Sequence, residues 1–242
     1  MRHKFVLITP LLLTATFLSA QTIKVDKDNR TLSVTASDHA EADPEVADLH
    51  IGFTAYGADL PSAYKSGSDL SKAITTALVT AGAPRSAIQS QTQRVSRLDD
   101  SEMKTRKGMK FGVTQSWIVS VEPKDAALVL DAAVQAGANQ SGQIDWRMKN
   151  SIALDAEAVK RATERARALA AALAQGMGTT LGKPLYATNG MDSQGLMHTP
   201  GAGLTMYEQA YRARNGVQTA PMSIEAQRVE RNAMVTLVFA IE

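Results

Sequence analysis

Apolar residues recur at gaps of three and four along residues 151–178, and this spacing predicts one long amphipathic helix. Alanine is dense in this stretch, which favours helix and lets a partner surface approach closely. Lys and Arg lie between the apolar positions, where their charged ends can stay in water. We expect the rest of the chain to fold as sheet against this helix. The apolar stripe consists of Val159, Ala162, Ala166, Leu169, Ala170, Leu173 and Met177.

Alternation of apolar and polar residues predicts the strands. The alternation is clearest over 47–55 and recurs over 111–121. Further strands or extended segments are predicted at 31–36, 86–98, 144–148, 181–188 and 235–241, with a turn region at 37–45 and a charged loop at 99–110. The sheet face expected under the long helix is formed by Leu49, Ile51, Phe53, Val119 and Phe239.

Two shorter helices are predicted between the strands. Asp59 is placed to cap a helix that ends at Gly82, and Pro123 opens another that ends at Gly137. From 47 to 148 the order is therefore strand, helix, strand, strand, helix, strand, the order of a split βαβ unit. The predicted fold class is α+β, with a mainly antiparallel sheet covered on one face by helices. It contains this βαββαβ unit plus the long Ala/Arg-rich helix.

The N-terminal residues 1–20 have the pattern of a secretory signal peptide. Basic Arg2 and Lys4 precede an apolar run that ends in small residues, which predicts cleavage after Ala20. A retained membrane anchor is the alternative, but the apolar run is short and contains Pro10. Cleavage is therefore the favoured interpretation, and it predicts a periplasmic or envelope-associated protein.

The mature chain is predicted to have a simple organisation. A polar leader at 21–30 precedes one domain at 31–242, and that domain contains a long loop at 189–221 without periodicity. A loop of this length is expected to be functional or mobile. No other apolar run is long enough to span a bilayer, so no transmembrane span is expected after signal cleavage.

Charge and cysteine content narrow the function classes. Removal of the signal lowers Lys plus Arg from 26 to 24, against 24 Asp plus Glu. The mature chain thus lacks the basic excess that favours nucleic acid. The chain has no Cys, which excludes thiol chemistry, zinc–thiolate sites and Fe–S clusters.

The residues predict no enzyme. A serine hydrolase needs a nucleophile, a base and an orienting acid. Only His39, His50 and His198 remain after signal cleavage, and no G-x-S-x-G elbow is present. His50 has the parity of a solvent-facing strand residue and is interpreted as an ordinary surface histidine. We therefore assign no catalytic residue, no cofactor-binding residue and no cofactor.

An acidic group in the predicted turn region is the first candidate for a cation. Carboxylates and an imidazole there could form a weak site, but acidic turns are usually only solvated, and we favour that interpretation. The residues concerned are Asp38, His39, Glu41, Asp43 and Glu45.

The long loop offers the second candidate, a set of thioether and imidazole ligands. Such ligands suit Cu(I), and the residues that would bind it are Met191, Met197, His198 and Met206. No tight Met-x-Met spacing is present, and methionine also fills interfaces because it is adaptable. We favour the interface interpretation, with Met206, Tyr207 and Tyr211 as candidate contact residues.

Four blocks in order carry a resemblance to a known family. They read LSVTASDHAEADPEVADLHIGF, TALVTAGAPRSAIQSQ, VLDAAVQAGANQSGQIDWRM and AEAVKRATERARALAAALAQGMGTTLGKP. In this pattern the chain resembles the SIMPL-domain family, exported bacterial proteins catalogued as a domain of unknown function. One departure is Phe111-Gly112-Val113, where the family often has an aromatic residue, Gly and Tyr.

The resemblance implies an envelope location, assembly into multimers and a link to stress tolerance, in some members oxidative. It brings no catalytic residues. The expected function is therefore a non-catalytic envelope protein that acts as a homo-oligomer and through envelope protein partners. The alternative is a periplasmic protein that binds Cu(I) or a small ligand through the Met/His loop at 191–222.

Overall fold

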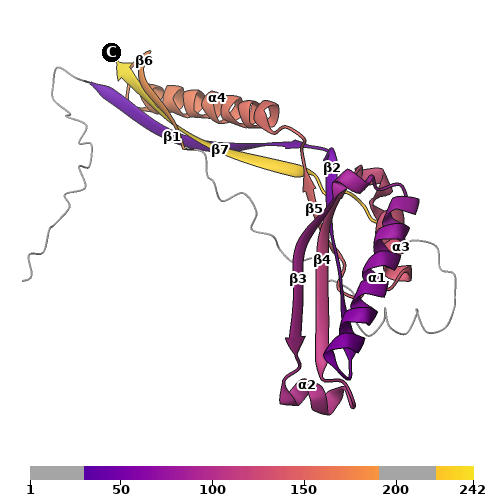
Figure 1. Cartoon of the computed structure of the whole chain (residues 1–242). Coiled ribbons are helices and arrows are strands. Elements are labelled where there is room, and N and C mark those ends of the chain that lie inside the picture. Colours follow the sequence, from indigo (N-terminus) through magenta and orange to yellow (C-terminus); the bar gives the residue numbers. More distant parts are fainter. Residues whose placement is uncertain (1–29, 191–221) are drawn as a thin grey trace, which may run out of the picture.

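The structure, a computed structural model, describes residues 30–190 and 222–242. Two antiparallel sheets lie one beyond the other, each with helix on one face (Figure 1). One sheet has the strand order β1-β7-β6 and carries α4. The other has the order β3-β4-β2-β5 and carries α1 and α3. The predicted α+β class with mainly antiparallel pairing is confirmed.

The elements follow the predicted order along the chain. The strands are β1 (Thr31–Ala42), β2 (Val46–Gly57), β3 (Ile88–Arg97), β4 (Phe111–Val121), β5 (Gln143–Arg147), β6 (Leu181–Gly190) and β7 (Val229–Ile241). The α-helices are α1 (Leu60–Thr80), α2 (Asp100–Thr105), α3 (Ala126–Gln135) and α4 (Ile152–Gly176), and short 3-10 turns precede β3 and α3.

Several predicted boundaries differ from the structure. β1 continues to Ala42, so residues 37–42 are strand and not part of a turn, because β7 pairs with them along their whole length. The charged loop at 99–110 contains α2, whose first turn is closed by a capping box between Asp99 and Glu102. β6 extends to Gly190, beyond the predicted start of the long loop at 189.

The split βαβ unit is present from β2 to β5. β2 pairs with β4 and β5, and β3 pairs with β4, so each βαβ half has one strand inserted between its two parallel strands. Alternate residues of β2 and β4 face α1 and α3 and form one hydrophobic core, which includes Leu49, Phe53 and Val119. Phe53 packs on Trp117 with ring centroids 5.8 Å apart.

The apolar pattern predicted that the long helix packs on this sheet face, and that prediction is wrong. α4 covers β1 and β7 and buries a second cluster that shares no residue with the first. Of the predicted sheet face only Phe239 belongs to this cluster. Leu49, Ile51, Phe53 and Val119 instead face α1 and α3.

The buried stripe of α4 also differs from the predicted one. Its buried residues recur strictly every fourth position, at Leu154, Ala158, Ala162, Ala166, Ala170 and Ala174. The larger residues Leu169, Leu173 and Met177 are exposed. Only a row of small side chains lets the helix backbone lie close to β1 and β7, which explains why the alanines face the sheet.

Candidate functional site

The residues proposed for Cu(I) and for subunit contact lie outside the described residues. They are Met191, Met197, His198, Met206, Tyr207 and Tyr211. Both interpretations therefore stay predictions. Within residues 30–190 and 222–242, no three His, Asp or Glu side chains converge as metal ligands.

The acidic candidates are spread along β1 and beyond it, and each carboxylate has another partner. Glu41 and Asp43 both pair with Arg228, at 3.1 and 3.4 Å. Glu45 Oε2 accepts a hydrogen bond from the backbone N–H of Lys149. These oxygens contact cationic and amide groups, which supports a structural role for the acidic residues.

β1 lies at one edge of its sheet, and its backbone groups alternate between the partner strand and the outside. Arg30 O accepts from Ile241 N on β7, so the backbone groups of even-numbered residues face β7 and those of odd-numbered residues face outward. The outward groups of Ser37 and His39 are therefore on the outer edge. An outer edge of this kind is a template on which another strand can pair.

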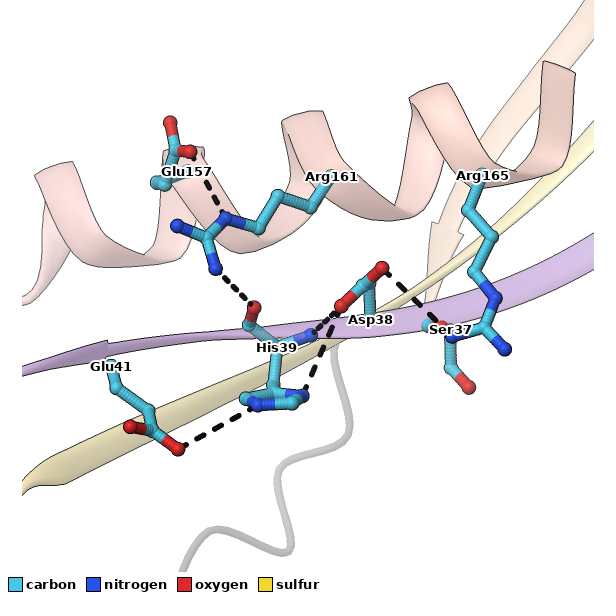
Figure 2. Close-up of polar contacts among 7 residues, drawn as sticks. All are labelled: Ser37, Asp38, His39, Glu41, Glu157, Arg161 and Arg165. Carbon is cyan, nitrogen blue, oxygen red and sulfur yellow. Dashed lines mark hydrogen bonds and ion pairs between the residues drawn. The ribbon is translucent and has the colours of Figure 1, made fainter. Parts of the chain in front are cut away.

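Two arginines of α4 occupy the outer edge of β1 at these residues (Figure 2). Arg161 Nη1 donates to His39 O at 3.3 Å, and Arg165 Nη1 lies 3.5 Å from Ser37 O. Asp38 Oδ1 accepts from the backbone N–H of His39 at 2.8 Å, and Asp38 Oδ2 is 3.9 Å from Arg165. These side chains bind the outward carbonyls of Ser37 and His39 and the outward N–H of His39, so we call Ser37–His39 with Arg161 and Arg165 the capped half-edge.

The capped half-edge is held in place by further carboxylates. Glu157 Oε1 accepts from Arg161 Nε at 3.1 Å, and this hydrogen bond holds the pKa of Glu157 below its ordinary value. The His39 imidazole lies between Asp38 and Glu41, with its nitrogens 3.8 and 3.6 Å from their oxygens. The cluster orders charged side chains along the outer edge of β1. By occupying backbone groups of that edge, it blocks the pairing of another strand at Ser37–His39.

A second polar group lies on the face of the β2 sheet opposite its helices. Asp48 of β2 lies directly across from Asp145 of β5, and two carboxylates in that register would repel each other. Arg147 Nε donates to Asp48 at 2.5 Å, and His50 Nε2 lies 2.7 Å from Asp145 Oδ2. His50 thus lies within hydrogen-bond distance of Asp145 across the two strands, a contact that the strand pattern alone did not indicate.

Burial raises the pKa of Asp48, but hydrogen bonds from Arg147 and Ser120 outweigh burial and hold that pKa below its ordinary value. Asp48 and Arg147 are 99 residues apart in the chain. The pair joins the central strand β2 to the short strand β5. We interpret it as a structural contact that secures β5.

A third ion pair connects the first turn of α4 to β7. Arg231 Nε donates to Asp155 Oδ1 at 2.6 Å, and Ser151 Oγ donates to Asp155 Oδ2 at 2.9 Å. The hydrogen bond from Arg231 is the largest reason why the pKa of Asp155 lies below its ordinary value. A carboxylate in the first turn also suits the positive end of the helix dipole.

We expect Asp155→Asn to lower the free energy of unfolding at neutral pH by about 1–3 kcal/mol, because a charged hydrogen-bond acceptor is lost. Since the folded-state pKa is depressed, the contribution of Asp155 is present above its unfolded-state pKa and is lost as pH falls through the folded-state pKa. The difference between wild type and variant should therefore shrink in acid. Urea denaturation at pH 7 and at pH 3 measures it.

Asp69→Asn is the matched control, because Asp69 pairs with Lys65 on the exposed face of α1. Its effect should stay within about 0.5 kcal/mol at both pH values. Equal effects for the two variants would contradict a structural role for the Asp155–Arg231 pair.

Comparison with known proteins assigns the chain to a family. The family model of SIMPL, described as a protein of unknown function (DUF541), matches residues 32–239. The chain belongs to the SIMPL family. The match spans both sheets and the four α-helices of the described part of the chain, and it confirms the resemblance carried by the four sequence blocks.

No curated protein matches the chain. Among the helices that the structure describes, none combines the length and the apolar character needed to cross a membrane.

Proposed function

We propose that this SIMPL protein is an exported, non-catalytic protein of the bacterial envelope that acts through self-assembly and contacts with partner proteins. The signal-peptide pattern of residues 1–20 supports export. The resemblance to SIMPL-domain proteins supports an envelope location and a contribution to stress tolerance.

The observation that carries self-assembly is a set of large apolar side chains exposed on the sheet that bears α4. They are Leu169, Leu173 and Met177 on α4, and Leu185 and Tyr186 on β6. Contiguous exposed apolar side chains mark interaction surfaces, and their spacing by four places Leu169, Leu173 and Met177 on one ridge of α4. A stable subunit contact would cover at least ~1,000 Å².

The polar clusters support a non-catalytic role. His39 and His50 both lie against carboxylates that are themselves engaged in salt bridges or register contacts between strands. Asp48, Asp145 and Asp155 join elements far apart in the chain. Each cluster thus contributes to the structure, and we assign no catalytic role to these residues.

Light scattering coupled to size-exclusion chromatography on residues 21–242 tests the proposal. We expect a mass of at least two chains at micromolar concentration. A strict monomer that takes up Cu(I) tightly, and loses that uptake when Met191, Met197 and Met206 are changed to Leu, would favour the copper-binding alternative instead.

A further inference from the structure

The outer edge of β1 differs along its length. At Ser37 and His39 the outward carbonyls are bound by α4 arginines, and the outward N–H of His39 is bound by Asp38. At Thr31, Ser33 and Thr35 no hydrogen bond from the described residues reaches the outward backbone groups. We call Thr31–Thr35 the open half-edge.

The exposed leucines of α4 lie beside this open half-edge. Arg161, Arg165, Leu169 and Leu173 are spaced by four and form one ridge of the helix. From Arg161 to Arg165 the contact on β1 moves from His39 to Ser37. Four helix residues rise ~6 Å and two strand residues ~6.8 Å, so the ridge and the strand stay in step.

Continued by the same steps, the ridge brings Leu169 level with Thr35 and Leu173 level with Ser33. Leu169 is 44% and Leu173 49% exposed. The ridge therefore changes from arginine to leucine where the strand edge changes from capped to open. A surface that joins unpaired backbone groups to exposed apolar side chains suits an added strand.

The sequence of the open half-edge fits a second copy of itself. Residues 31–35 read Thr-Leu-Ser-Val-Thr, which is close to a palindrome. In antiparallel pairing centred on Ser33, Thr31 meets Thr35, Leu32 meets Val34, and Ser33 meets Ser33 of the second copy. Thr–Thr and apolar cross-strand pairs are favourable, and the odd-numbered residues that would exchange hydrogen bonds are those whose groups face outward.

Helix packing agrees with this arrangement. α4 lies over both β1 and β7, and neighbouring strands are ~4.8 Å apart. In a sheet continued through two copies of β1, the two α4 axes would be ~10 Å apart, the separation of directly packed helices. Antiparallel α4 ridges centred on Leu173 would bring Leu169 against Met177 of the second copy.

We infer that the open half-edge of β1 and the leucine ridge of α4 form a two-fold interface with a second copy of this chain. This inference rests on the proposed self-assembly and names its surface. The capped half-edge limits the pairing to Thr31–Thr35. It also keeps Arg161 and Arg165 of the two copies apart, which avoids repulsion between like charges.

Cysteine cross-linking tests the register, because the chain contains no Cys. Directly opposite residues of a hydrogen-bonded antiparallel pair have Cα atoms ~5.5 Å apart, within the range of a disulfide. Ser33→Cys in the mature chain should form a covalent dimer under mild oxidation. Ser37→Cys, on the same strand and face but in the capped half-edge, should cross-link at least tenfold less.

Proline substitution tests the hydrogen bonds. The N–H of Ser33 faces outward, so Ser33→Pro removes no bond to β7 and should keep the circular dichroism of wild type. Its mass by light scattering should fall at least twofold, while Ser37→Pro should keep the wild-type mass.

The outcomes separate the two proposals. A monomeric wild type overturns self-assembly and this inference together. A multimeric wild type that shows no Ser33→Cys cross-link, and keeps its mass in Ser33→Pro, overturns only the inference. That second result is also expected if another segment or another protein occupies the β1 edge.

Discussion

Replacement of Ala166 by aspartate is expected to lower the free energy of unfolding by about 3–5 kcal/mol, because a carboxylate would be buried without a partner. Ala166 is fully buried in the alanine row of α4 and packs in the cluster formed with β1 and β7. A domain of ordinary stability has ~5–15 kcal/mol in total. The variant should therefore be largely unfolded in low concentrations of urea, as measured by circular dichroism.

Ala172→Asp is the matched control, since Ala172 lies on the exposed side of the same helix. Its cost should be limited to the lower helix propensity of Asp, at most about 0.7 kcal/mol. If both variants melted alike, the alanine row would not be the packed face of α4. Leu169→Asp, at an exposed position, should likewise have little effect on folding while weakening assembly.

Phe53→Ala is expected to cost about 3–5 kcal/mol through lost burial and the cavity that remains. Phe53 is fully buried at the centre of the core between β2, β4 and the helices α1 and α3. Its ring packs on Trp117, and a side chain at Gly67 would lie within 3.7 Å of it. Because Trp117 is itself buried, urea denaturation followed by tryptophan fluorescence measures this change.

Tyr64→Ala serves as the comparison, because Tyr64 of α1 is a large aromatic residue that remains mostly exposed. Its effect should be within about 0.5 kcal/mol. A similar loss of stability in both variants would show that aromatic content, and not the packing around Phe53, determines the result.

Local sequence determined the type and order of the elements. The period of two over residues 47–55 and 111–121 produces β2 and β4, and the period near four over residues 151–178 produces α4. Capping residues such as Asp59 set the helix start. These signals depend on residues within a few positions of one another, so the split βαβ unit and the SIMPL resemblance were both predictable.

The tertiary structure alone decided which surface each element covers. The leucine row and the alanine row of α4 are neighbours on the helix, and both satisfy a helical period. The sheet of β1 and β7 selected the alanines because they allow close approach. The polar residues 37–42 became strand only because β7 supplies hydrogen bonds to their backbone.

The candidate site depended on the same long-range contacts. Arg161 and His39 are 122 residues apart, and His50 and Asp145 are 95 residues apart. No local pattern indicates that an arginine on a helix will cap the carbonyl of a distant strand. The sequence by itself determined that residues 31–35 form a strand of alternating polar and apolar residues that is nearly palindromic. That this strand lies at an open edge beside exposed leucines follows only from the way β1, β7 and α4 pack.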